Sequence, residues 1–186
     1  MNSNDGMHVL LTNDDGFEAP GIQAMRSVLR TRGYRVSMVA PSEEQSATSM
    51  STTTRRNLAL ADLGEGIWHL DAQPADTVFV ALRHLLESDP PDLVVSGVNF
   101  GPNLGTGLHA SGTVGAAIVA ALHGYPAIAV SAGMLFEEAV EKPPTFPSTL
   151  DVLGPAAEFT CNVIESLRSS ALSGDLLPRG VLLNIN

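Results

Sequence analysis

The stretch "HVLLTNDDGFEAPGIQAMRSVLRTRG", residues 8–33, sets a pattern that the rest of the chain repeats. It opens with a short apolar run, residues 8–11, of the kind that forms a buried strand. Its second half carries apolar side chains at helical spacing and stops at Gly33. Between the two halves stand adjacent acids, Asp14 and Asp15, followed at once by glycine. A strand, a loop and a helix in this order predict one unit of a parallel α/β sheet.

The same alternation of strand and helix continues along the chain. Apolar runs predict further strands at 34–41, 67–71, 91–97, 126–131 and 180–186. Helical periodicity predicts helices at 75–88, 113–124 and 149–172, the last interrupted near Pro155. Strands that are apolar on both faces and separated by helices are typical of a parallel sheet covered on both sides. We therefore expect an α/β, doubly wound fold.

Composition narrows the class of protein. With 186 residues, 44% of them hydrophobic, the chain can bury one sizeable core, so we expect a single domain over residues 1–186. Twenty acidic against ten basic residues give a formal charge of -10, which argues against duplex nucleic acid as a partner. The single cysteine, Cys161, excludes an internal disulfide and suits a reducing compartment.

Targeting and membrane signals are also missing from the sequence. The opening residues, "MNSNDG", are polar and lack the pattern of a signal peptide. The longest apolar stretch, residues 114–134, is broken by Gly124 and Pro126, so it predicts a buried helix and strand rather than a membrane span. We expect a cytoplasmic protein without a membrane partner.

Asp14 and Asp15 follow the first strand, where ligands bind in such sheets. An Asp-Asp-Gly sequence is often no more than a turn, because Asp bonds the local backbone and glycine accepts positive φ. At this position, however, carboxylates converge on a crevice, and adjacent acids are best tolerated when a divalent cation takes both. The sequence leaves both interpretations open and favours the cation.

A glycine-rich loop, residues 96–115, follows the strand at 91–97. It lacks the Gly-Lys-Ser/Thr of a phosphate-binding P-loop. "GTGLHA" fits a dinucleotide fingerprint, but it does not directly follow the strand, and no acid stands about 20 residues later. What remains is "SGTV", residues 111–114, opening a helix whose N-terminus favours an anion. An ordinary helix cap is the alternative for Ser111 or Thr113 alone.

Other oxygen donors stand in the loops after the strands. The segment "APSEEQSATSMS", residues 40–51, is rich in serine, and the glycine-rich loop adds Asn99 and Asn103. Carboxylates, hydroxyls and amide carbonyls suit hard cations, which favours Mg²⁺ or Mn²⁺ over structural zinc. A hard cation beside an anion-binding helix start indicates phosphoryl chemistry.

At this point four segments resemble the signatures of the SurE family (survival protein E), in the same order. They are "LLTNDDGFEAPGI" (10–22), "MVAPSEEQSATS" (38–49), "DLVVSGVNFGPNLG" (92–105) and "SGTVGAA" (111–117). The resemblance implies a Rossmann-like three-layer α/β/α sandwich with a mostly parallel sheet. It also implies a metal-dependent 5′/3′-nucleotidase, with one divalent cation per subunit, that hydrolyses nucleoside monophosphates. A homo-oligomer, dimer or tetramer, is expected with it.

The resemblance also assigns residues to roles. It implies that Asp14, Asp15, Ser46 and Asn99 bind the metal. It places Asn103, Ser111, Gly112 and Thr113 near the substrate phosphate. Asp14 is our candidate for orienting or deprotonating the attacking water. His109 is a weaker candidate for the general acid, because a loop histidine is more often solvated.

The sequence departs from the family pattern in two places. Ala47 stands where the family usually has glycine, and alanine would shift the backbone if positive φ were needed there. The chain ends at "VLLNIN", residues 181–186, where family members typically continue, so we expect the C-terminal segment usual in the family to be lacking.

Two rival functions can be weighed on the residues. Phosphatases with an aspartate nucleophile need an Asp two positions before a second Asp, and Asn13 stands two before Asp15. A covalent phosphoenzyme is therefore not expected. A catalytically silent nucleotide- or metal-binding module of the same fold is the alternative, and phosphate release with Mg²⁺ or Mn²⁺ would separate it from an enzyme.

Overall fold

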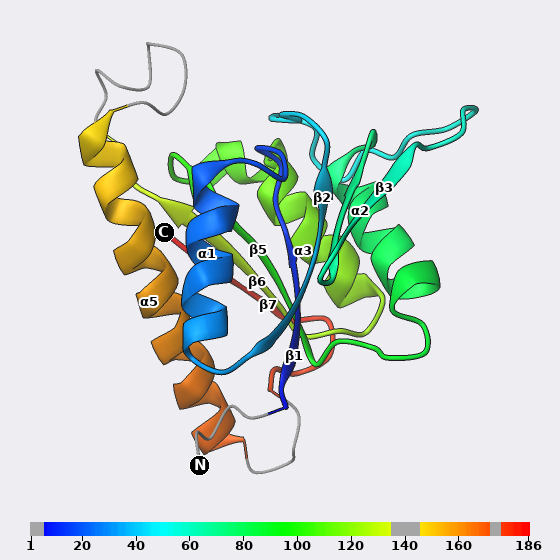
Figure 1. The fold of residues 1–186 in the computed structure, drawn as a ribbon. Helices are drawn as coiled ribbons and strands as arrows, with labels where there is room; N and C mark the ends of the chain where they lie inside the picture. The colour runs from blue at the N-terminus through cyan, green and yellow to red at the C-terminus, as the bar shows by residue number, and fades with distance from the viewer. Residues whose placement is uncertain (1–5, 135–145, 172–175) are drawn as a thin grey trace.

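The computed structural model describes residues 6–134, 146–171 and 176–186, and the predicted end of the last helix at residue 172 lies outside them. Seven strands form one sheet in the order β3-β4-β2-β1-β5-β6-β7 (Figure 1). The strands are β1 (His8–Thr12), β2 (Arg35–Pro41), β3 (Leu60–Gly64), β4 (Ile67–Leu70), β5 (Leu93–Phe100), β6 (Ala127–Ala132) and β7 (Leu182–Ile185). The helices are α1 (Pro20–Thr31), α2 (Pro74–Val80), the π-helical turn η1 (Ala81–Leu85), the 3₁₀ turn η2 (Gly105–His109), α3 (Gly112–Leu122) and α5 (Pro147–Ser170).

The sheet is parallel except at one edge, where β3 and β4 form an antiparallel pair. This arrangement confirms the expected α/β fold with a mostly parallel sheet. The edge strand β3 was not predicted from the sequence, because its five residues are short of a clear alternation and most of them are exposed, Leu60 and Leu63 included. Its pairing with β4 supplies the structure that its own side chains do not.

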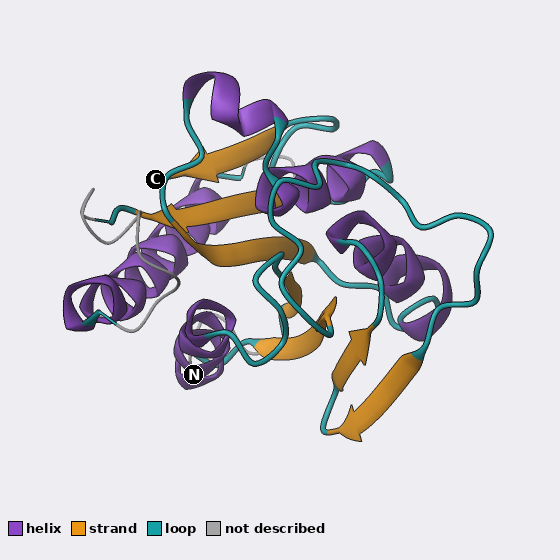
Figure 2. Cartoon of the chain, turned by 90° about the horizontal axis from the view of Figure 1, so that it is seen from above, coloured by secondary structure: helices purple, strands orange, loops and turns teal. Residues whose placement is uncertain are grey.

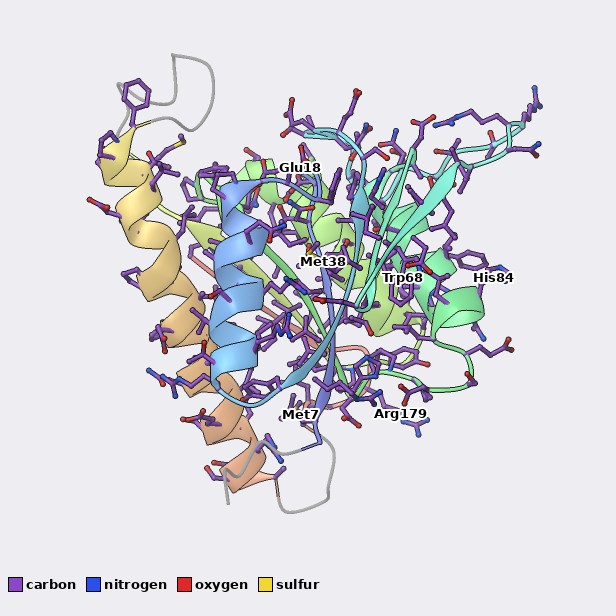
Figure 3. The ribbon with its side chains drawn as sticks, viewed as in Figure 1. Met7, Glu18, Met38, Trp68, His84 and Arg179 are labelled. Atoms are coloured by element: carbon purple, nitrogen blue, oxygen red, sulfur yellow. The ribbon has the colours of Figure 1, made fainter. Side chains whose placement is uncertain are left out.

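Helices cover both faces of the sheet, which gives the three layers expected (Figure 2). On one face α1 and α5 pack against each other, and on the other α2 packs against α3. Each face has its own apolar cluster. Met38 of β2, labelled in Figure 3, belongs to the cluster under α1 and α5. Leu10 of β1 belongs to the cluster on the α2 and α3 side. Its neighbours Val9 and Leu11 belong to the cluster under α1 and α5, so successive residues of β1 contribute to opposite cores.

The structure corrects two predicted boundaries. Strand β5 continues past Gly97 to Phe100, because Asn99 and Phe100 resume pairing with β6 after an irregularity in the register. The helix predicted to be interrupted near Pro155 is instead continuous as α5. Pro155 is exposed on α5, and the carbonyl that it leaves unpaired, that of exposed Asp151, can bond water there.

The carboxyl ends of β1, β2 and β5 meet at the upper edge of the sheet in Figure 1, where the loop after β1 runs into α1. Figure 3 labels Glu18 in that loop, and Figure 2 looks down on this edge. The loops with the predicted site residues all leave the sheet here. Within the residues that the structure describes, no helix has the length and apolarity needed to cross a membrane.

Candidate active site

Asp14 and Asp15 lie in a tight turn directly after β1. The turn is held by Asn13, whose Nδ2 donates to the carbonyl of Gly16 at 2.8 Å, and Gly16 has a φ of 99°. The two aspartate carboxylates are therefore not the groups that hold the turn. Asp14 is only 3% exposed, and Oδ2 of Asp15 is buried without a hydrogen-bond partner. Two adjacent carboxylates, one buried and the other partly buried with an unpaired oxygen, need positive charge that the turn does not supply.

The electrostatics of the pair show the same need. Burial raises the pKa of Asp15 to about 8, and the negative charges of Asp14 and Glu44 contribute to the increase. Burial also raises the pKa of Asp14, although hydrogen bonds from Thr113 oppose the increase. Both carboxyls are thus poorly stabilised as anions by the protein alone. A divalent cation between them would restore the charged forms.

The start of α3 lies directly against Asp14. The hydroxyl of Thr113 donates to Oδ1 of Asp14 at 2.5 Å, and the backbone N–H of Thr113 also bonds this carboxylate. Ser111 is the N-cap, and its Oγ accepts from the N–H of Val114 at 3.1 Å. The predicted helix start and cap are therefore present. The N-terminus of α3 therefore stabilises an anion that belongs to the protein itself, the Asp14 carboxylate.

Gly112 is required by this contact. An ideal Cβ at position 112 would lie 2.8 Å from both Cβ and Oδ2 of Asp14, closer than real Cβ atoms approach other heavy atoms. Position 115 is equally closed, because a Cβ there would lie 2.1 Å from the carbonyl oxygen of Ser49. The glycines of "SGTVGAA" thus let α3 pack closely against the loops after β1 and β2.

The loop after β2 brings Ser46 to the site. The backbone of this loop is bonded to two other loops of the site. The N–H of Gln45 donates to the carbonyl of Asp14 at 2.6 Å, and the N–H of Ser49 donates to the carbonyl of Ala110 at 3.0 Å. Ala47 has a φ of 62°. The backbone therefore takes the positive φ that a glycine would favour, and alanine is accommodated with strain rather than with a displaced loop.

Asn99 and Asn103 stand at the end of β5 and in the loop beyond it. The Nδ2 group of Asn99 donates to the carbonyls of Phe100 and Gly101, at 3.0 and 2.7 Å. This leaves Oδ1 of Asn99 available as a ligand oxygen. Asn103 donates through Nδ2 to Oγ of Ser131 on β6, at 2.9 Å.

These loops enclose a cleft of about 250 Å³. Five of the eight predicted site residues line it, together with backbone and small side chains: Asp14, Ser46, Asn99, Asn103 and Ser111. Asp15 is next to Asp14 in the chain, and Gly112 and Thr113 contact Asp14 from the start of α3. Among the described residues no group of three or more His, Cys, Asp and Glu side chains could hold a metal ion. A cation here would therefore rely on two carboxylates completed by neutral oxygens, the donor set that hard ions accept.

His109, the weaker candidate for the general acid, and the two aromatic residues nearest the predicted site, Phe17 and Phe100, differ in position. His109 is exposed on η2 and does not line the cleft. Phe17 stacks on His69, with ring centroids 4.2 Å apart, whereas Phe100 is partly buried and lines the cleft.

Three side chains that bond Asn103, one on β6 and two on or just after β7, were not predicted from the sequence. These side chains are Ser131, Asn184 and Asn186. A signal for them exists, because polar residues follow apolar ones on one face of each strand.

Comparison with known proteins gives a consistent result. A profile of the family described as Survival protein SurE matches residues 9–186. A protein of Carboxydothermus hydrogenoformans called 5'-nucleotidase SurE is 50% identical over 134 residues, which cover 68% of this chain and 50% of that protein. One of the same name from Pelobacter propionicus is 41% identical over 180 residues, or 97% of this chain and 65% of the relative.

A solved structure is also similar. The crystal structure of the SurE protein from Aquifex aeolicus matches with a TM-score of 0.75 and 32% identity, covering 90% of this chain and 62% of that one. The chain thus spans between half and two thirds of the length of these three proteins.

Proposed function

The chain belongs to the SurE family, and from this premise we propose that it is a divalent-metal-dependent phosphomonoesterase that hydrolyses nucleoside 5′- and 3′-monophosphates. One observation carries the proposal: two adjacent carboxylates are short of positive charge, and the buried one, Asp14, lies against the N-terminus of α3 and lines a cleft. The names of the relatives support nucleotide substrates. Hydrolysis at the 3′ position goes beyond those names and is part of the proposal.

Asp14, Asp15, Ser46 and Asn99 would hold the cation, Mg²⁺ or Mn²⁺. The unpaired Oδ2 of Asp15 and the free Oδ1 of Asn99 support this set, because both are oxygens that the fold leaves without a donor. When bound, such an ion supplies positive charge to the phosphoryl oxygens and makes a water more acidic.

The residues of the chain would perform the remaining tasks. Asp14, which lines the cleft, would orient the attacking water and take its proton as the water oxygen bonds phosphorus and the ester P–O bond breaks. A raised pKa suits a group that must accept a proton. Ser111, Gly112 and Asn103 would contact the phosphate, and Thr113 would act through the Asp14 carboxylate that it bonds.

The test is turnover of a panel of 5′- and 3′-nucleoside monophosphates and p-nitrophenyl phosphate, with Mg²⁺ or Mn²⁺ and then with EDTA. We expect metal-dependent phosphate release that Asp15→Asn reduces by at least about 100-fold, as removal of a charge-stabilising group does. Asp151→Asn, an exposed acid on α5, is the matched control and should keep wild-type turnover. Nucleotide binding without phosphate release in metal would instead favour a silent binding module.

We also propose that the protein is cytoplasmic and homo-oligomeric, a dimer or tetramer, as the family resemblance implies. Light scattering of the purified chain measures the second of these directly. A monomer at micromolar concentration would contradict it.

A further inference from the structure

We infer that Asn184 and Asn186 of the β7 region are positioning residues, which hold Asn103 in the cleft for phosphate binding. The N–H of Asn103 donates to Oδ1 of Asn186 at 2.8 Å, and Nδ2 of Asn184 donates to the carbonyl of Asn103 at 2.9 Å. Both backbone polar groups of Asn103 are thus bonded by side chains more than 80 positions away, sequence separations of 83 and 81. We call these two residues, with Ser131, the Asn103 clamp.

The clamp follows from the alternation of side chains along two parallel strands. On β7, Leu182 packs into the cluster on the α2 and α3 side of the sheet, and Asn184 occupies the next position on that face. On β6, Ala129 belongs to the same cluster and Ser131 follows it. Each strand is therefore apolar where the helices cover it and polar where the loop after β5 crosses above. The polar positions bond one residue of that loop, Asn103.

The clamp leaves Asn103 one useful group. A primary amide carries two N–H bonds, and Ser131 accepts one of them at 2.9 Å. The second remains available to the cleft, which Asn103 lines. With its backbone and one side-chain hydrogen bonded, Asn103 can donate to a phosphate oxygen without first ordering its loop, so the entropic cost of binding is lower. A loop held only by its own residues would incur that cost with each substrate.

The inference rests on the proposed function and adds that different residues support phosphate binding and metal binding. The side chains of Asn184 and Asn186 bond Asn103 and not the side chains of Asp14, Asp15 or Asn99. Loss of either asparagine should therefore weaken phosphate binding while metal binding persists. A general loss of folding would weaken both. The ratio of the two affinities is therefore the informative quantity.

The experiment uses the full chain with Asn184→Leu, which removes the donor and keeps the same number of side-chain heavy atoms and the same branching. It also uses Asn186→Ala, at an exposed position where folding is not at risk. Leu183→Ala is the matched control, because it weakens the same strand from the opposite face, where Leu183 packs with the α1 and α5 cluster. For each variant we would measure Mn²⁺ affinity by calorimetry, competitive inhibition by inorganic phosphate, KM and kcat. Hydrogen exchange of the loop at residues 100–108 would report the clamp without reference to catalysis.

For Asn184→Leu and Asn186→Ala we expect KM and the phosphate inhibition constant to rise about tenfold, the cost of one well-placed hydrogen bond, with Mn²⁺ affinity unchanged and faster loop exchange. Leu183→Ala should lower the melting temperature without these changes. Unchanged exchange and phosphate inhibition in both clamp variants would overturn the inference, and so would an equal effect in Leu183→Ala. Faster exchange in a chain whose wild type neither binds phosphate nor releases it would instead refute the proposed function and leave the clamp as a structural device.

Discussion

The hydroxyl of Thr113 donates a 2.5 Å hydrogen bond to Oδ1 of Asp14, which joins the first turn of α3 to the loop after β1 across 99 positions of sequence. Both groups are buried, with Thr113 at 0% and Asp14 at 3% exposure. The bond lowers the pKa of Asp14 against the effect of burial. It also holds Oδ1 of Asp14 in place, and this fixes the orientation of the whole carboxylate, Oδ2 included. Three predictions concern this site, and a fourth concerns His8 at the opposite end of β1.

Replacing Thr113 with valine removes the hydroxyl at nearly constant volume. We expect the free energy of unfolding to fall by about 1–2 kcal/mol, because a buried carboxylate loses a partner. The pKa of Asp14 should rise further, so the acid limb of the pH–rate profile should move to higher pH. Steady-state kinetics across pH measures this shift. An unmoved profile with wild-type kcat/KM would show that the Thr113 hydroxyl has no part in setting the state of Asp14.

Replacing Asp15 with asparagine should stabilise the metal-free protein. Burial raises the pKa of this carboxyl from its ordinary value of about 4 to about 8, so between these two pH values the folded state holds a proton that the unfolded state has released. Stability of the wild type is then greatest at low pH and declines as pH rises toward 8. We expect Asp15→Asn to lack this decline and to be more stable at pH 8 in EDTA by at least about 1 kcal/mol.

Added Mn²⁺ should make the wild type more stable than Asp15→Asn, the reverse of the order in EDTA. It stabilises the wild type by binding the folded state and should have little effect on Asp15→Asn. Thermal melts with EDTA and with Mn²⁺ give both comparisons. A variant that Mn²⁺ stabilises as much as it does the wild type would exclude Asp15 from the metal site.

Replacing Gly112 with alanine should be harmful even though alanine is the better helix former. The new Cβ would lie 2.8 Å from Asp14 Cβ and Oδ2 and 3.1 Å from Oγ1 of Thr48, so the start of α3 must move away from the carboxylate. We expect a loss of stability of about 1–3 kcal/mol and a fall in kcat/KM of at least about tenfold. Gly133→Ala is the control, because nothing lies within 4 Å of a Cβ there. If the two variants behave alike, the close contact at Gly112 is unimportant.

His8 should make stability depend on pH near neutrality. Its Nε2 lies 2.8 Å from Oγ of Ser37, and burial, followed by the charge of Arg35, lowers its pKa despite the nearby carboxylates Asp89 and Asp92. The unfolded chain then takes up a proton near pH 6.5 that the folded protein does not. The contribution of His8 is complete above that pH and is lost as pH falls below it toward the folded pKa.

Denaturant titrations of wild type and His8→Gln between pH 8 and pH 5 would measure the effect. The difference in unfolding free energy between the two proteins should change with a slope of at most about 1.4 kcal/mol per pH unit, the limit for one proton. A difference that stays constant across this range would show that His8 titrates alike in the folded and unfolded states.

The sequence alone predicted the order of strands and helices, the α/β class and the start of α3 at "SGTV". Each of these depends on local periodicity or on a cap, which a short window of sequence contains. It also predicted which loops carry the candidate residues, because parallel strands place all their carboxyl ends at one edge. The residues Asp14, Ser46 and Asn99 accordingly meet at one cleft.

The tertiary structure decided what depends on pairing between distant segments. The edge strand β3 forms because β4 offers it a partner, and β5 extends to Phe100 because Asn99 pairs with Ser131 across the sheet. Asn103 is held by Asn184, and the positive φ of Ala47 is imposed by a loop bonded at both ends. The partner of each of these residues cannot be read from its own segment, because the hydrogen bonds join residues that only the folded chain brings together.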